Sequence, residues 1–196
     1  MGKVKYIRDI REFFKKSPIV DINSLKRFIN RKDKSYINLL ISNLVKRKEI
    51  KKITKGFYTI HEDPSLVVFC FNPSYLGIQN ALSFHNLWEQ ETNPAVLTVR
   101  NVRTGLRKVF DRNVIIKRLP AEYFFGFDYY EDGDFYLPYS DIEKTFIDMV
   151  YFKEYIDKEV IKEFRKKIDK KKLKSYLKKY PLKFRKTALE IYNPKH

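Results

Sequence analysis

Apolar residues in the first 60 positions recur at intervals of three and four, which is the spacing of one face of a helix. Three stretches show this spacing and are predicted as helices: about 4–16, 24–29 and 33–48. Ser17-Pro18 is expected to end the first, and Asp21 or Asn23 to cap the second. These signals predict three amphipathic helices that share one small core.

A pair of short β-rich runs follows the third helix. Residues 50–54 and 57–60 are separated by Lys55-Gly56, and a glycine between two such runs is typical of a hairpin. Three helices followed by a hairpin is the element order of a winged helix-turn-helix domain. In that fold the third helix lies in the major groove of DNA.

Residues 61–152 show shorter and more mixed patterns. The continuous apolar run 66–71 predicts a buried strand, and Pro73-Ser74 is expected to open a helix that reaches about Leu87. Further strands are expected at 95–101 and 109–119, and as a hairpin at 123–130 and 135–139. Ser140 and Glu143 have the spacing of a capping box, which predicts a helix from that point.

The last segment, 153–196, is predicted to form two or three basic helices broken at Pro181. Its apolar stripe needs a buried partner. Two interpretations stay open: the segment lies along DNA phosphates, or it forms a dimerisation or membrane-surface element. The predicted fold class is α/β (α+β), with a winged helix-turn-helix domain at 1–62. An α/β domain at 63–196 follows, with basic C-terminal helices from about 153.

Charge separates the same regions. The chain has 41 Lys and Arg against 24 Asp and Glu, for a net charge of +17, with +12 over 1–60, −5 over 61–152 and +10 over 153–196. Two basic ends around an acidic middle predict a surface that binds a polyanion. A lysine-rich solvated surface is the alternative interpretation.

The outward side of the third helix, the turn before it and the hairpin are polar or basic. Hydroxyl and amide side chains can hydrogen-bond base edges, and asparagine prefers adenine. Lysine and arginine suit phosphates, which position a domain without specifying sequence. The residues predicted to contact DNA are Arg31, Lys32, Lys34, Ser35, Tyr36, Asn38, Ser42, Lys46, Lys51, Lys52 and Lys55.

Composition argues against several other classes. A single cysteine, Cys70, rules out a disulfide framework, and no uncharged apolar stretch reaches the roughly 18 residues of a spanning helix. Charges appear too early for a secretory signal, so a cytoplasmic protein with no membrane partner is expected. The glycines do not have dinucleotide-loop or Walker spacing.

An enzymatic function is not expected. The Asp/Glu-x-Lys pattern of a metal nuclease occurs only at 49–51 and 169–171, away from any expected core strand. Cys70 is interpreted as an inert core residue, and His85 as a core or surface histidine. We therefore predict no catalytic residue, no metal and no cofactor. A nuclease targeted by the winged domain and a protein-interaction module stay as alternatives.

Two segments of the middle region carry a family resemblance. Tyr75-Leu76-Gly77, Asn80-Ala81-Leu82 and His85-Asn86-Leu87 resemble the helix that follows the winged domain in the AbiEi family. Ser140 to Asp148 resembles that family's acidic "ER-x-x-x-D" helix, with Lys144 in place of the usual arginine. The family comprises antitoxins and transcriptional regulators of type IV toxin–antitoxin (abortive infection) systems, and the resemblance covers about residues 1–152.

The resemblance implies a repressor that binds double-stranded DNA at inverted repeats near its own promoter. It also implies a second domain that counteracts a nucleotidyltransferase-like toxin without forming a stable complex with it. A homodimer stays open. Arg103, Arg107 and Arg118 are predicted to form part of the antitoxin surface, and Asp148 is expected to pair with one of them.

Overall fold

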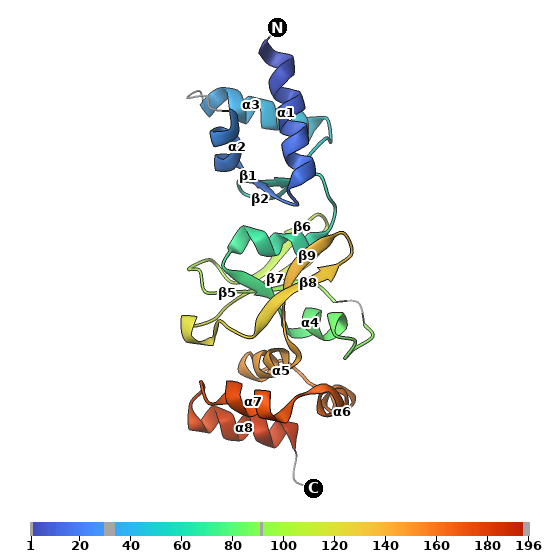
Figure 1. Cartoon of the computed structure of the whole chain (residues 1–196), viewed down its shortest axis with the longest axis vertical. Coiled ribbons are helices and arrows are strands. Elements are labelled where there is room, and N and C mark those ends of the chain that lie inside the picture. Colours follow the sequence, from blue (N-terminus) through green and yellow to red (C-terminus); the bar gives the residue numbers. More distant parts are fainter. Residues whose placement is uncertain (1, 30–33, 91, 194–196) are drawn as a thin grey trace. The chain divides into compact units, whose positions relative to one another are not determined.

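The chain has a mixed α/β fold, in which helices and strands are interspersed along the sequence (Figure 1). The structure is a computed structural model that describes residues 2–29, 34–90 and 92–193. The chain forms two units, one from residues 1–70 with 109–112 and one from residues 71–108 with 113–196. No helix in the described ranges is long and apolar enough to cross a membrane.

The first unit contains three helices and a three-stranded antiparallel sheet. In chain order these are α1 (Gly2–Lys16), β1 (Val20–Asp21), α2 (Ile22–Ile29), α3 (Lys34–Lys46), β2 (Lys51–Thr54) and β3 (Phe57–Thr59). The sheet order is β1-β3-β2. The three predicted helices and the hairpin are confirmed. The two-residue strand β1 was not expected, because it pairs with β3, more than 30 residues away.

The core of the first unit follows the predicted helix faces. Phe14 from α1, Leu25 from α2, and Ile37 and Leu44 from α3 are all buried. Asp21 caps α2, because its Oδ1 accepts hydrogen bonds from the backbone N–H groups of Asn23 at 2.9 Å and Ser24 at 3.0 Å. Of the two expected caps, the structure selects Asp21.

The apolar run at 66–71 forms a 3₁₀ helix, η1 (Pro64–Phe71), so the predicted strand is wrong. Apolar periodicity cannot separate a buried strand from a buried helical segment. Asp63 stabilises the start of this helical segment, because its side chain accepts from the N–H of Ser65 at 2.8 Å. Pro64 suits the first position of a helical turn.

The second unit has a six-stranded mixed sheet with the order β6-β7-β5-β4-β9-β8. Its strands are β4 (Ser74–Leu76), β5 (Ala95–Thr98), β6 (Gly105–Val109), β7 (Arg112–Arg118), β8 (Phe127–Asp132) and β9 (Phe135–Ser140). Its helical elements are α4 (Ile78–Phe84), η2 (Ala121–Tyr123), α5 (Ile142–Tyr151), α6 (Lys158–Lys167), α7 (Lys170–Leu177) and α8 (Leu182–Tyr192). The β8–β9 hairpin is confirmed.

The expected helix from Pro73 is wrong at its start. Residues Ser74 to Leu76 form β4, which pairs antiparallel with β5 and parallel with β9, and the helix begins only at Ile78. The partners of β4 lie 20 to 63 residues away in the sequence, beyond the reach of any local pattern. Similarly, β6 was not anticipated as a strand separate from β7.

Asp141, not Ser140, caps α5. The Asp141 side chain accepts from the N–H of Lys144 at 2.8 Å, whereas Ser140 is the last residue of β9 and pairs with Phe127. The predicted capping box is therefore wrong by one residue, because pairing in the sheet extends through Ser140. Glu143 is buried and turns toward α7.

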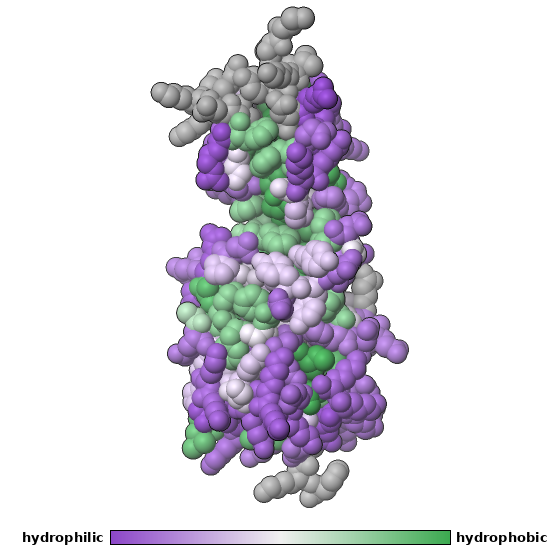
Figure 2. All heavy atoms as spheres, viewed as in Figure 1, coloured by the Kyte–Doolittle hydropathy of each residue, from purple (hydrophilic) through white to green (hydrophobic). Residues whose placement is uncertain are grey.

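Helices α6, α7 and α8 pack against α5, and their apolar stripe is core. Phe164, Leu173, Leu177 and Tyr180 are buried in one cluster with Phe146 of α5. The expected buried partner of the C-terminal stripe is thus α5. Figure 2 shows hydrophilic side chains over most of the visible outer face of these helices.

Candidate nucleic-acid interface and a buried polar network

The outward face of α3 is polar in the first unit. Asn38, Ser42, Asn43 and Lys46 are exposed, while the opposite face of the helix is buried in the core. The division follows from helical spacing, since side chains three and four positions apart share one face. A row of hydrogen-bonding groups therefore points away from the core.

A hollow of about 320 Å³ joins this face to the β2–β3 hairpin. Asn38, Ser42 and Lys46 of α3 line one side, and Lys52 and Tyr58 of the hairpin line the other. The structure thus brings four of the predicted DNA-contacting residues together, although 14 positions separate Asn38 from Lys52.

The other predicted residues of this interface have different surroundings. Lys55 is exposed at the hairpin turn, but Lys51 forms an ion pair with Glu62. Tyr36 is half-buried and packs against the core of the first unit. Arg31 and Lys32 lie outside the described residues, as do the side chains of Lys34 and Ser35.

Two exposed residues of the same region were missed in the sequence. Leu39 is 62% exposed on the outward face of α3, and Arg47 is exposed directly after the helix. Leu39 stands three positions before Ser42 and Arg47 stands four positions after Asn43, so the spacing of a helix face would have included both.

A fully buried ion pair lies in the second unit. Lys144 and Asp148 are one turn apart on α5, and neither side chain is exposed. The Tyr75 hydroxyl donates to Asp148 Oδ2 at 2.7 Å, and Lys144 Nζ donates to the Tyr180 hydroxyl at 3.2 Å. Burial lowers the pKa of Lys144 and raises that of Asp148, and the attraction between the two charges opposes both shifts.

The expectation that Asp148 pairs with an arginine is therefore wrong. Lys144 stands four residues before Asp148 on the same helix, and side chains at this spacing meet without the help of a distant loop. Arg103 and Arg118 are exposed, whereas the Asp148 side chain lies entirely within the core.

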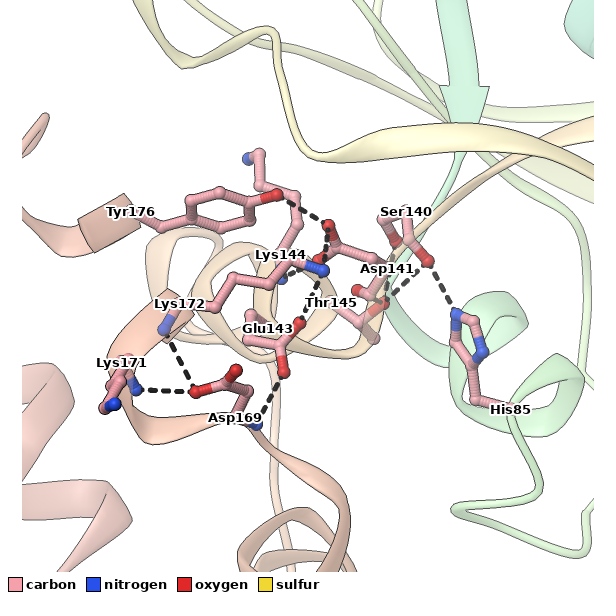
Figure 3. A network of polar contacts seen from close by, with 10 residues as sticks. All are labelled: His85, Ser140, Asp141, Glu143, Lys144, Thr145, Asp169, Lys171, Lys172 and Tyr176. Atoms are coloured by element: carbon pink, nitrogen blue, oxygen red, sulfur yellow. Dashed lines mark hydrogen bonds and ion pairs between the residues drawn. The ribbon is translucent and has the colours of Figure 1, made fainter. Parts of the chain in front are cut away.

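A second group of contacts joins the start of α5 to α7 (Figure 3). Lys172 Nζ lies 3.2 Å from a carboxylate oxygen of Asp141 and 3.1 Å from one of Glu143. The Tyr176 hydroxyl donates to Asp141 at 2.8 Å, and the backbone N–H of Asp169 donates to Glu143 at 2.8 Å. Two carboxylates of α5 thus hold α7 at three points.

The pKa shifts in this group reflect these contacts. Burial alone would lower the pKa of Lys172, but the hydrogen bond with Glu143 and the charge of Asp141 outweigh it and raise that pKa. Burial and the hydrogen bond to Asp141 together raise the pKa of Tyr176 to about 12. The protonated forms of both side chains are therefore favoured in the folded chain.

His85 connects α4 to the end of β9 (Figure 3). Its Nε2 lies 2.7 Å from the backbone carbonyl oxygen of Ser140, and burial lowers its pKa. The Ser140 hydroxyl in turn hydrogen-bonds Thr145 of α5 at 2.8 Å. His85 thus has a structural role, as do the polar residues of the segment from Ser140 to Asp148.

The three arginines predicted for an antitoxin surface gather at the loop between β5 and β6. Arg118 donates to the side-chain oxygen of Asn101 at 2.9 Å. Arg107 donates to the carbonyl oxygen of Arg103 at 2.5 Å, and its guanidinium lies 5.1 Å from the centre of the Phe71 ring. The structure therefore places the three residues at or beside one loop.

The two Asp/Glu-x-Lys matches have structural partners. Glu49 forms an ion pair with Arg11 at 2.7 Å, and Asp169 caps α7 by accepting from the N–H of Lys171 at 2.7 Å. In the described part of the chain, no three His, Cys, Asp or Glu side chains form a group that could hold a metal ion. Cys70 is buried, and burial raises the pKa of its thiol to about 12.

No family model matches the chain, and a search of curated proteins finds no match either. The structure itself defines a mixed α/β protein of two units. The first unit carries a polar helix face beside a basic hairpin, and the second contains a mixed sheet and helices with a fully buried ion pair on α5.

Proposed function

We propose that the chain is a sequence-specific DNA-binding repressor whose first unit is a winged helix-turn-helix domain. The hollow shared by α3 and the hairpin is the observation that supports this most directly. An outward helix face beside a basic hairpin is the arrangement in which a helix enters the major groove and a wing meets the backbone.

The side chains divide into two roles on this proposal. Asn38 and Ser42 read base edges, with Asn38 suited to adenine, and exposed Leu39 suits the methyl group of thymine. Lys46 and Lys52 contact phosphates from the two sides of the hollow. Lys51 is paired with Glu62, so it contributes less to the attraction for phosphates than Lys52 or Lys55 does.

We propose further that the protein acts as the antitoxin of a type IV toxin–antitoxin system. In this role it represses its own operon and counters a nucleotidyltransferase-like toxin in the cytoplasm, and it is not itself an enzyme. The support is the resemblance of residues 75–87 and 140–148 to the AbiEi family. Because the polar side chains of 140–148 have structural partners, the arginines around the β5–β6 loop are the better candidates for the antitoxin effect.

Fluorescence anisotropy on the gene's own upstream DNA tests the DNA-binding proposal, with a shuffled duplex as competitor and a salt series. Asn38→Ala should lose about 1–3 kcal/mol of discrimination between the two duplexes. Lys52→Gln should weaken binding to both duplexes alike and lower the salt slope by about one. Asn93→Ala, an exposed asparagine in a loop of the second unit, is the matched control.

Equal and purely salt-driven binding to both duplexes would contradict sequence-specific recognition. It would leave a generic polyanion surface as the function of the first unit. A flat response to all DNA would instead favour a protein-interaction module.

Co-expression with a nucleotidyltransferase-like toxin tests the antitoxin role. Arg103→Ala, Arg107→Ala and Arg118→Ala should lose protection from the toxin while DNA binding stays unchanged. Lys108→Ala, an exposed cation on β6, is the control. Full protection by the triple variant would exclude these arginines from the antitoxin surface.

A further inference from the structure

A groove of about 800 Å³ lies on the second unit between the end of α5 and α8. Its apolar lining comes from α5, the segment that follows it, and α8. The apolar lining residues are Val150, Tyr151, Ile156, Pro181, Phe184 and Ile191. A volume of this size lies within the range of small-molecule sites in proteins, about 300–1,000 Å³.

The floor of the groove is built from packed aromatic rings. Phe184 stacks on buried Tyr180 with ring centres 4.7 Å apart, and the rings of Tyr151 and Phe184 meet edge to face at 6.1 Å. Since Tyr180 also stacks on Tyr123 at 4.1 Å, the floor is continuous with the core of the unit. The groove is thus a preformed apolar surface and does not depend on one movable side chain.

The end of α5 sets the position of one rim. The N–H of Lys153 donates to the carbonyl of Val150 at 3.1 Å, and that of Glu154 donates to Met149 at 2.9 Å, which closes the helix. Lys153 has a φ of +55°, so the chain turns there toward Tyr155, which is 84% exposed. A large aromatic ring therefore stands at the mouth of the groove.

The rim carries a net positive charge. Lys153, which follows α5, and Lys183 of α8 both line the groove, and both are exposed. Glu154 also lines the groove, but its carboxylate pairs with Lys117 and accepts from Gln79 at 2.7 Å. The negative charge in the lining is thus neutralised, while the two lysines remain at the solvent edge.

We propose that this groove binds a small apolar carboxylate, with the hydrocarbon body on Tyr151, Ile156 and Phe184 and the carboxylate at Lys153 and Lys183. Apolar walls with a few charged groups at one edge are the composition of sites that orient an amphipathic ligand. A second copy of the chain fits less well, because α8 carries Lys183, Arg185 and Lys186 and would repel another α8. The inference does not rest on the proposed DNA binding.

Displacement of 1-anilinonaphthalene-8-sulfonate from the full-length protein tests the site. The dissociation constant of decanoate, measured by displacement of the probe, should be about five- to tenfold lower than that of decanol, which has the same chain length and no charge. Lys153→Gln with Lys183→Gln should remove that preference. Lys186→Gln, which alters a neighbouring α8 cation outside the lining, should keep it.

Thr187→Trp separates the groove from other apolar surface. Thr187 is exposed and lines the groove, so an indole at this position fills it without entering the core. Decanoate affinity should fall at least tenfold, while the far-ultraviolet circular dichroism spectrum and the melting midpoint stay unchanged.

Three results would each overturn the proposal. They are equal affinity for decanoate and decanol, unchanged decanoate affinity in Thr187→Trp, and concentration-dependent self-association that Thr187→Trp abolishes. The last would assign the groove to a second copy of the chain.

Discussion

Lys144 and Asp148 lie one turn apart on α5 with no side-chain surface exposed, so each depends on the other for its charge partner. Tyr75 and Tyr180 complete the hydrogen bonding of the pair. Removal of one partner from such a pair leaves an uncompensated buried charge, which is far more costly than replacing both. This asymmetry gives the pair a sharp experimental signature.

Asp148→Ala should lower the free energy of unfolding by about 3–5 kcal/mol, because it leaves the Lys144 ammonium unpaired in the core. The double variant Lys144→Met with Asp148→Leu should recover most of that loss. Urea denaturation measures both. The exposed pair Glu159–Lys162 serves as control, and Glu159→Ala should change stability by less than about 0.5 kcal/mol. A similar small effect for Asp148→Ala would show that the pair is not buried.

Gly126 is the second residue where local geometry decides stability. It has a φ of +71°, and an added Cβ would lie 2.9 Å from both Lys144 Cβ and Tyr176 Cε2. Gly133 has a similar φ of +59° but no atom within 4 Å of the same position. Both glycines have a left-handed backbone conformation, but only Gly126 lacks room for a Cβ atom.

Gly126→Ala should therefore destabilise the chain by about 1–3 kcal/mol more than Gly133→Ala does. This difference is the usual cost of overpacking, about 1–3 kcal/mol. Thermal and urea unfolding of the two variants measure the difference. Equal losses would mean that the backbone conformation alone, and not the approach to Lys144 and Tyr176, accounts for the glycine.

At the scale of elements, α5 is the segment on which the second unit is assembled. All residues from Glu143 to Val150 are buried. Asp141 and Glu143 hold α7, Asp148 holds Tyr75 of β4, and Phe146 packs against α6. One of the two segments in which the sequence analysis finds a family resemblance, 140–148, thus has polar residues that are explained by the packing of helices on the sheet.

The α5–α7 contacts predict a loss of stability in alkali. Because the folded chain raises the pKa of Tyr176 to about 12, it keeps a proton that the unfolded chain loses near pH 10. The free energy of unfolding should thus be at its full value below about pH 10 and fall as pH rises toward 12. The raised pKa of Lys172 acts in the same direction.

Tyr176→Phe isolates the contribution of that hydroxyl. Its unfolding free energy should decline less steeply than that of the wild type between about pH 10 and 12, as measured by urea denaturation at each pH. Tyr129→Phe, at a tyrosine that is 55% exposed, should decline as the wild type does. Parallel curves for wild type and Tyr176→Phe would show that the contact with Asp141 does not stabilise the fold.

At the scale of the whole molecule, the C-terminal segment 153–196 carries a net charge of +10 and also supplies part of the core of the second unit. Deletion of residues 153–196 would remove Phe164, Leu173 and Leu177 from the core of the second unit. Such a truncation cannot separate an effect of charge on DNA binding from a loss of folding. Substitution of exposed lysines can, because their side chains lie outside that core.

Replacement of Lys170, Lys171, Lys174 and Lys178 by Gln tests whether the C-terminal helices lie along DNA phosphates. The slope of log affinity against log salt should fall by about one for each of these lysines that contacts a phosphate. The matching Lys→Arg variant should keep the wild-type slope. An unchanged slope in a normally folded glutamine variant would leave these helices a structural role alone.

Several elements could be predicted because their signals are local. The three helices of the first unit, the β2–β3 hairpin and α5 each follow from spacing and turn residues within about 15 positions. The outward set Asn38, Ser42 and Lys46 followed from the same helical spacing. The strand predicted at 66–71 was wrong because a continuous apolar run is compatible with both a buried strand and a buried 3₁₀ helix.

The amino-acid sequence by itself thus determined the helical faces, the hairpins and the uneven charge, since each depends on neighbours along the chain. Only the tertiary structure decided that Ser74 to Leu76 form a strand, that Asp148 pairs with Lys144, and that α5 and α8 enclose a groove. These features depend on residues that lie far apart in the sequence. Their energies come from burial and from partner geometry, which exist only once the elements have packed.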